Sequence, residues 1–296
     1  MMDPAPLPGP GAAPRAPFGR RLCDVSSNRD SGGYRVVSLL DREGPEPAAG
    51  QFYMLAAAAG WGARDGRAFL PRAISVAATM PAAGGGVRLD FLLDAVGPGT
   101  GRLCDLEPGE GVWVTGPLGN SFAAPREVSP AAAGAVLVGG GVGVAPLALL
   151  RGRFAARGVP HRVLLGFRDR AHTGGLDLFC GSSGALCPEV RLATEDGSQG
   201  VQGRVTDLLL PILAGDDAAS GVVYTCGPPA MLEAVRALCA EHGVACELAL
   251  ESPMACGFGA CFGCAVPKPG GGFLRLCVDG PVLRGGEVEE VSHAYA

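Results

Sequence analysis

The 296-residue sequence lacks the features typical of proteins that bind nucleic acids or membrane surfaces. It contains no run of Lys or Arg, its formal net charge is −5, and its isoelectric point is near 5.4. Such a chain offers no cationic patch to a phosphate backbone or to anionic headgroups. The composition therefore excludes nucleic acids and membrane surfaces as expected partners and leaves proteins or small molecules.

Signals for export and for membrane insertion are also missing. Residues 1–17 are rich in Pro, Ala and Gly without a basic segment and an apolar core, so they predict a disordered tail rather than a signal peptide. Eleven cysteines, an odd number, favour free thiols in the cytoplasm over a secreted disulfide framework. The uncharged stretch 128–150 is long enough to cross a bilayer, but its glycines and Pro146 favour a strand, a turn and a helix start.

The length suffices for two or three domains, and 48 Gly and 25 Pro predict many turns. Short apolar runs separated by Gly and Pro predict an antiparallel β-barrel over residues 18–125. The expected strands are 34–40, 51–57, 73–77, 87–93 and 111–115. The Ala/Pro-rich stretch 123–133 predicts a linker.

After the linker, strand-like and helix-like segments alternate, which predicts a doubly wound parallel α/β domain over residues 134–245. The expected strands are 135–138, 162–165, 190–194 and 222–225, and the expected helices are 146–157, 205–213 and 229–242. Residues 246–296 are rich in Gly and Cys and predict a small domain organised by a metal cluster. We find no internal repeat.

Four cysteines in this last segment have the order C-x4-C-x2-C-x12-C, close to the spacing that holds a [2Fe-2S] cluster in plant-type ferredoxins. They are Cys256, Cys261, Cys264 and Cys277. Glycines between them allow the backbone to wrap closely and to point N–H groups at sulfur. A zinc site is an alternative, but zinc ligands usually come as two short hairpins, whereas one loop supplies three ligands here. Four unliganded core cysteines are a further alternative, which the clustering disfavours.

Two glycine turns in the α/β region each follow a predicted strand and precede a predicted helix. Such turns present N–H groups and a helix N-terminus to an anion such as a pyrophosphate, although a glycine turn can also be only a tight turn. Two of them at adjacent strand ends form a crevice of the kind that binds ligands. Cys226 would lie at its mouth as a candidate catalytic residue, with a small buried side chain as the alternative. The turn residues are Gly139, Gly140, Gly141, Gly143, Gly227 and Pro228.

In the barrel region, Arg72, Ala73, Ile74 and Ser75 offer a cation and a hydroxyl, which suit a phosphate and the edge of a ring. In chain order, R-x-I-S, G-x-G-T, G-P-L-G-N, G-G-G-x-G-x-A-P-L, G-F-R, C-G-P-x-x-M-L and M-x-C-G-x-G-x-C-x-G-C follow one another. This order resembles the ferredoxin-reductase superfamily. More narrowly, it resembles the electron-transfer subunits of heteromeric, NAD-dependent dihydroorotate dehydrogenases, from about residue 18 to the end.

The resemblance implies an FAD-binding barrel, an NAD-binding α/β domain and a [2Fe-2S] cluster on the four cysteines. It further implies an FMN-containing catalytic partner in a heterotetramer, and electron flow from dihydroorotate to NAD⁺ in pyrimidine biosynthesis. Arg168 and Arg170 could accept a 2′-phosphate, so NADP stays an alternative. The residues matched to FAD binding are Arg72, Ala73, Ile74, Ser75, Leu92, Leu93, Asp94, Gly99 and Thr100.

Two other functions fit the same motifs. The chain could be an NAD(P)H-dependent reductase subunit that serves another acceptor, such as a sulfite reductase, a hydrogenase or a transhydrogenase-type complex. It could also be a zinc-stabilised binding module that keeps a reductase fold without catalysis. Flavin and iron–sulfur absorption in the purified protein would distinguish the module from the reductases.

Overall fold

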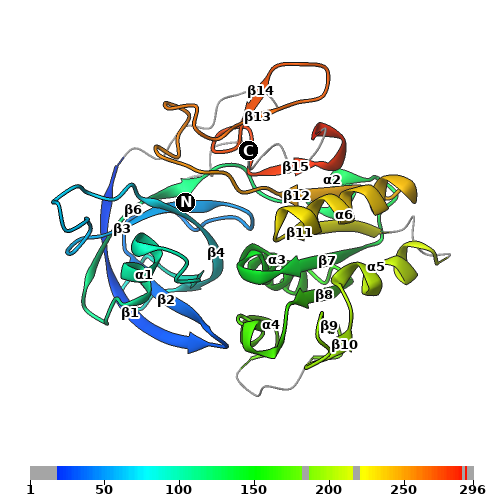
Figure 1. The fold of residues 1–296 in the computed structure, drawn as a ribbon, viewed down its shortest axis with the longest axis horizontal. Coiled ribbons are helices and arrows are strands. Elements are labelled where there is room, and N and C mark those ends of the chain that lie inside the picture. Colours follow the sequence, from blue (N-terminus) through cyan, green and yellow to red (C-terminus); the bar gives the residue numbers. More distant parts are fainter. Residues whose placement is uncertain (1–18, 182–186, 216–220, 289–290, 292–296) are drawn as a thin grey trace.

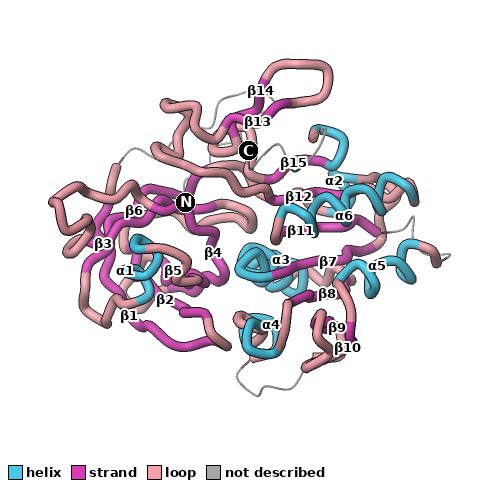
Figure 2. The backbone as a smooth tube through the Cα atoms, viewed as in Figure 1, coloured by secondary structure: helices cyan, strands magenta, loops and turns pink. Residues whose placement is uncertain are grey.

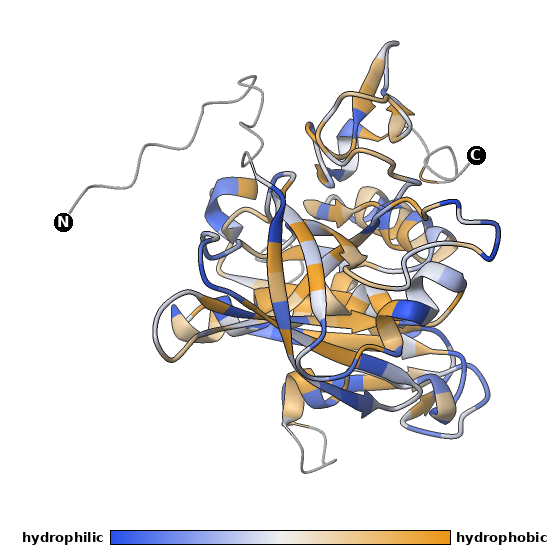
Figure 3. Ribbon diagram, turned by 90° about the vertical axis from the view of Figure 1, so that its left-hand side faces the viewer, coloured by the Kyte–Doolittle hydropathy of each residue, from blue (hydrophilic) through white to orange (hydrophobic). Residues whose placement is uncertain are grey.

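The computed structural model describes residues 19–181, 187–215, 221–288 and 291, so the predicted tail lies outside the described residues. A six-stranded barrel and a seven-stranded sheet lie side by side, and a small two-stranded unit projects above them (Figure 1). Apolar residues are concentrated in the strands of the barrel and of the sheet (Figure 3). Each of these two parts therefore has an apolar interior.

The barrel is closed and antiparallel, with strand order β1-β2-β5-β4-β3-β6, as predicted. β1 was not predicted because its sequence is mostly polar, and its side chains only partly alternate between buried and exposed. The helix α1 (Pro98–Cys104) was predicted as a turn, although Pro98 at its first position favours a helix start. The strands are β1 (Arg21–Ser31), β2 (Tyr34–Asp41), β3 (Phe52–Ala57), β4 (Arg72–Pro81), β5 (Val87–Leu93) and β6 (Gly111–Leu118).

The second sheet has the order β10-β9-β8-β7-β11-β12-β15 and is parallel except for the last pair. α3 packs on one face, and α5 and α6 pack on the other, which confirms the doubly wound arrangement (Figure 2). The strands are β7 (Gly134–Gly140), β8 (His161–Phe167), β9 (Val190–Thr194), β10 (Val201–Gln202), β11 (Gly221–Cys226), β12 (Cys246–Ala249) and β15 (Val282–Arg284). The helices are α2 (Pro125–Val128), α3 (Val144–Ala156), α4 (Asp177–Cys180), α5 (Val205–Leu213) and α6 (Pro229–Glu241), with short 3-10 turns η1 (Gly141–Gly143), η2 (Arg170–His172) and η4 (Gly285–Glu287).

The uncharged stretch 128–150 folds as the strand, turn and helix start that the sequence predicted, namely β7, η1 and the first half of α3. α3 lies between the sheet and the barrel strand β4, and every residue from Val144 to Leu150 is buried. A helix covered on both sides needs no polar face. In the described part of the chain, no helix is long and apolar enough to cross a membrane.

The segment predicted as a separate cluster domain, 246–296, begins in the α/β sheet and returns to it at β15. β12 and β15 are strands of that sheet, and the residues between them leave it to form the hairpin of β13 (Ala265–Pro267) and β14 (Phe273–Arg275). The barrel is tied to the returning chain because the Asn120 amide donates to the Val282 carbonyl at 2.7 Å. The residues that carry the four cysteines thus form an insertion between two strands of the α/β sheet. The domain boundaries stay predictions.

Candidate cofactor sites

A cavity of about 400 Å³ lies between the barrel and the sheet. Most of the residues matched to FAD line it: Ala73, Ile74, Ser75, Leu92, Leu93, Asp94 and Thr100. Val142 of the β7–α3 turn and Ala145 of α3 close one side, and residues 250–254 close another. Apolar walls with a few hydroxyls suit a flat ring system that needs hydrogen bonds at its edge. The cavity therefore fits a flavin.

Arg72 and Gly99 lie against each other beside this cavity. A Cβ atom on Gly99 would lie 2.6 Å from a guanidinium nitrogen of Arg72, so a larger residue at this position would displace the guanidinium. Arg72 also donates to the Leu70 carbonyl at 2.5 Å and lies over the Trp61 ring at 5.8 Å. These contacts fix a cation at the cavity, where it can bind a phosphate of the nucleotide.

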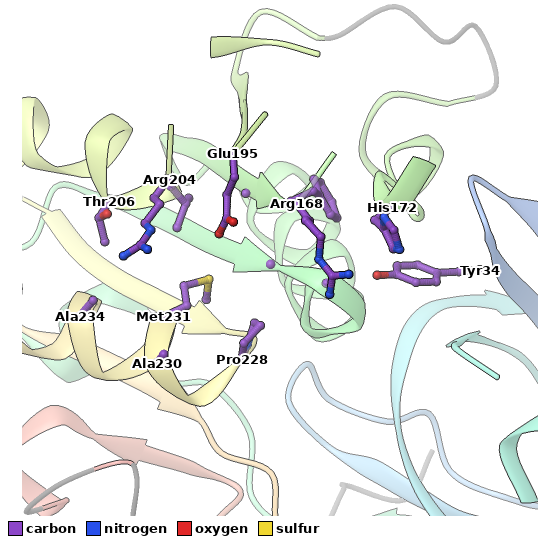
Figure 4. Close-up of a pocket in the computed structure, with 15 residues that line it drawn as sticks. Tyr34, Arg168, His172, Glu195, Arg204, Thr206, Pro228, Ala230, Met231 and Ala234 are labelled. Carbon is purple, nitrogen blue, oxygen red and sulfur yellow. The ribbon is translucent and has the colours of Figure 1, made fainter. Parts of the chain in front are cut away.

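A second cavity, of about 370 Å³, opens at the carboxyl ends of the parallel strands (Figure 4). The predicted residues Gly140, Gly141 and Pro228 line it, as does Arg168, whereas the exposed Arg170 does not. Sequence reasoning missed several lining side chains, which come from separate strand ends and helices. They are Tyr34, His172, Glu195, Arg204, Thr206 and Met231. This is the position at which open α/β sheets bind dinucleotides.

The other predicted glycines allow close packing rather than lining the cavity. A Cβ atom on Gly143 would lie 2.5 Å from the Gly227 Cα atom, so the two glycine turns touch through their backbones. A Cβ atom on Gly139 would lie 2.9 Å from Leu147 of α3, which allows the helix to approach the strand. These glycines bring the two turns together at the crevice.

The turn between β7 and α3 is a wall of both cavities. Gly141 lines the dinucleotide cavity, while Val142 and Ala145 line the flavin cavity. Ligands in the two cavities would therefore lie on either side of one short turn. Such an arrangement brings two cofactors close to each other at the carboxyl edge of the sheet.

Cys226 ends β11 next to these cavities but is buried, with 2% of its surface exposed, rather than exposed at the crevice mouth. Its side chain belongs to the apolar core that also contains the buried residues of α3, which cover this part of the sheet. Burial raises the pKa of the Cys226 thiol well above its usual value, and Glu251 raises it further, although the Gly227 N–H group lowers it. The thiol is therefore neutral at physiological pH, and a catalytic role for it stays a prediction.

The four predicted ligand cysteines come together as two pairs. The Cys264 and Cys277 sulfurs lie 3.2 Å apart, and Cys256 hydrogen-bonds with Cys261. Burial raises the pKa of the Cys256 thiol, but N–H groups of Phe258, Cys261 and Ala260 and the Cys261 thiol more than offset this, and the pKa falls to about 7. Backbone N–H groups thus point at sulfur, as the glycine-rich loop predicted.

This pairing suits a cluster with two metal atoms. Two thiolate pairs would provide two ligands to each iron of a [2Fe-2S] cluster, whereas tetrahedral zinc needs four ligands around one centre. Cys264 and Cys277 are buried, while Cys261 is exposed. One edge of the cluster site therefore faces the surface.

The cluster loop rests on the barrel. Gly257 has φ +80, and a Cβ atom there would lie 2.6 Å from Met54 of β3. The residues just before the loop, 250–254, line the flavin cavity. The cluster site and the flavin cavity therefore adjoin.

We expect Gly257→Ala to push this loop off the barrel and to lower the content of iron and acid-labile sulfide. The control is Gly270→Ala, because Gly270 has φ +78 and no described residue has an atom within 4 Å of its Cβ position. Both variants carry a similar backbone strain of about 1–2 kcal/mol, but only the first adds a clash. Assays of iron and acid-labile sulfide measure the cluster content of each variant. Equal cluster contents in the two variants would show that the contact with Met54 does not position the loop.

A closed antiparallel barrel joined to a parallel α/β sheet, with a ligand cavity between them, defines the ferredoxin-reductase type of flavoprotein. The solved NADH-dependent reduced ferredoxin-NADP oxidoreductase has a TM-score of 0.74 and 25% identity, covering 93% of this chain and 92% of its own. A ferredoxin NADP⁺ reductase from Neisseria gonorrhoeae, with bound FAD and NADP, shares the fold at a TM-score of 0.59 and 18% identity, covering 76% of this chain and 92% of its own.

Similarity in sequence identifies the family within this class of flavoproteins. The dihydroorotate dehydrogenase B (NAD⁺) electron transfer subunit of Caldanaerobacter subterraneus subsp. tengcongensis is 33% identical over 89% of this chain and 96% of its own. That of Bacillus caldolyticus is 42% identical over 65% of this chain and 70% of its own. Residues 251–289 match the iron-sulfur cluster binding domain of dihydroorotate dehydrogenase B. The chain belongs to the family of dihydroorotate dehydrogenase B (NAD⁺) electron transfer subunits.

Proposed function

We propose that this chain carries electrons from the FMN of a dihydroorotate dehydrogenase catalytic subunit to NAD⁺, through a [2Fe-2S] cluster and FAD, in pyrimidine biosynthesis. The observation that carries the proposal is the adjacency of the three sites: residues 250–254 lead into the cluster cysteines and line the flavin cavity, which shares a turn with the dinucleotide cavity. We also propose that it acts in the cytoplasm, in a heterotetramer with the catalytic subunit.

Bound FAD exchanges a hydride with nicotinamide and single electrons with an iron–sulfur cluster. The chain binds and orients it. Ile74, Leu92 and Leu93 would exclude water from the ring, Ser75 would offer a hydroxyl to its edge, and Arg72 would neutralise phosphate charge. NAD⁺ would lie across the turn at Gly141 from the flavin.

The catalytic subunit would dock at the exposed edge of the cluster. Phe258, Phe262 and Phe273 on this segment are 51%, 62% and 71% exposed. Exposed aromatic residues are typical of protein interfaces. They lie on the segment that also carries the exposed Cys261, so a partner that covers them would lie next to the cluster site.

The test is to combine the purified chain, loaded with both cofactors, with its catalytic subunit and to follow NAD⁺ reduction by dihydroorotate. The proposal predicts activity from the mixture and none from the catalytic subunit alone. Copurification with a sirohaem or nickel protein, without dihydroorotate-dependent reduction, would favour a reductase subunit for another acceptor. A colourless preparation that contains zinc would favour the binding module.

Glu195 is expected to select NAD over NADP. It follows β9 and lines the dinucleotide cavity with Arg168 and Arg204 (Figure 4). A carboxylate at such a strand end hydrogen-bonds ribose hydroxyls and repels a 2′-phosphate. Glu195→Gln should therefore shift the NADPH-to-NADH ratio of kcat/KM by about tenfold toward NADPH, because one repulsive charge is removed and two arginines remain.

The control for this prediction is Glu107→Gln, which removes the same charge from an exposed position on the barrel. The measurement is steady-state reduction of an artificial acceptor with each nucleotide. An unchanged ratio in Glu195→Gln would show that specificity is set elsewhere.

A further inference from the structure

One side chain of the barrel domain reaches into the dinucleotide cavity. Among the residues that line this cavity, Tyr34 of β2 is the one that precedes the α/β domain in the chain. Its hydroxyl points toward Arg168, and its ring comes from the side opposite α6 (Figure 4). The cavity is therefore completed by both domains.

The hairpin that carries Tyr34 is fixed to the α/β domain. The Ser31 hydroxyl accepts a hydrogen bond from the Gly175 N–H group at 3.0 Å and donates one to Asp177, which also pairs with Arg29. The Tyr34 ring packs on Gly174, where a Cβ atom would lie 2.2 Å from a ring carbon. The ring is buried and held by its neighbours, so its position does not depend on the hydroxyl.

The hydroxyl itself lies over the first glycine turn. A Cβ atom on Gly141 would lie 3.9 Å from the Tyr34 oxygen, and Gly141 has φ +56. Burial raises the pKa of Tyr34, and Asp94 raises it further while Arg168 lowers it. The hydroxyl therefore stays protonated at neutral pH and can act as a donor over the turn.

We propose that the Tyr34 hydroxyl donates a hydrogen bond to the pyrophosphate of NAD(H). The proposal rests on the proposed function, because it requires NAD(H) in this cavity. The glycine turn is where backbone N–H groups and the start of α3 would meet the pyrophosphate. A tyrosine O–H group placed above the same turn adds a charge-assisted hydrogen bond. Tyr34 is thus a positioning residue that fixes the dinucleotide between the two domains.

The test is Tyr34→Phe in the chain loaded with both cofactors, because this change keeps the ring and removes only the donor. We expect the KM for NADH and the Kd for ADP-ribose to rise about tenfold, as for loss of one hydrogen bond to a charged group. The value of kcat at saturating NADH should not change, because the bond is present in both the ground state and the transition state. AMP, which has no pyrophosphate, should lose less affinity than ADP-ribose.

The matched control is Tyr53→Phe. The Tyr53 hydroxyl is buried in the barrel and has no hydrogen-bond partner among the described residues, and its side chain lines neither cavity. The Tyr53→Phe variant should therefore keep the wild-type KM for NADH and the wild-type Kd for ADP-ribose. Wild-type KM and Kd in Tyr34→Phe, or equal losses for AMP and ADP-ribose, would overturn the proposal for Tyr34. Failure of the wild-type chain to react with NADH or to bind ADP-ribose would instead contradict the proposed function.

Discussion

Cys277→Ala is expected to abolish the iron–sulfur cluster and, with it, dihydroorotate-dependent reduction of NAD⁺ by the complex. Cys277 is buried, and its sulfur lies 3.2 Å from that of Cys264, so the variant leaves one pair of sulfurs incomplete. The loss of activity should exceed about a hundredfold, since even loss of groups that only orient metal ligands costs about 10–100-fold. Reduction of the flavin by NADH should persist, because Cys277 lines neither cavity.

Assays of iron and acid-labile sulfide measure the cluster content. Rapid mixing with NADH separately measures reduction of the flavin. The control is Cys23→Ala, because Cys23 is equally buried but lies in the barrel and is not one of the four predicted ligand cysteines. It should keep the full cluster. A full iron and sulfide content in Cys277→Ala would contradict the assignment of this residue as a ligand.

Arg72→Ala is expected to release FAD while leaving the cluster in place. The side chain lies between Trp61 and Gly99 beside the flavin cavity, where it offers a fixed positive charge. Loss of hydrogen bonds to a charged phosphate, at about 1.5–3 kcal/mol each, should weaken FAD binding by about 10–100-fold. Without the flavin, neither NADH oxidation nor cluster reduction by NADH should occur.

Flavin retained after dialysis and the Kd for added FAD measure this effect. Arg67→Ala is the control for charge, because Arg67 is exposed and forms an ion pair with its near neighbour Asp65. A second matched pair tests the contact itself. Gly99→Ala would clash with the Arg72 guanidinium and should also weaken FAD binding, whereas Gly101→Ala in the same helix meets nothing within 4 Å. Tight FAD binding in both Arg72→Ala and Gly99→Ala would rule out this phosphate contact.

The fold was largely predictable because its strands are short apolar runs with Gly and Pro between them. The barrel and the alternation of strands and helices in the sheet followed from this pattern. β1 was missed because it is polar, and α1 because Gly97, Pro98 and Gly99 are turn residues. That β12 and β15 belong to the sheet was not predictable from local pattern, because pairing between distant strands depends on the tertiary fold.

The site was predictable only where its residues are contiguous. The R-x-I-S strand and the cysteine loop each place several side chains at one point, so spacing was informative. Tyr34, Glu195 and Glu251 reach the cavities from separate elements, and only Glu195 carried a signal, its position after a predicted strand. Cys226 was predicted at the crevice mouth from its strand-end position, but its side chain is buried in the apolar core that includes α3.

The most direct test of this account is an anaerobic titration of the purified chain with NADH, with flavin and cluster absorption followed together and metal content assayed. We expect equimolar iron and acid-labile sulfide, bound FAD, and reduction of both chromophores by NADH. Zinc in place of iron, no acid-labile sulfide, or a cluster that stays oxidised while the flavin is fully reduced would contradict it.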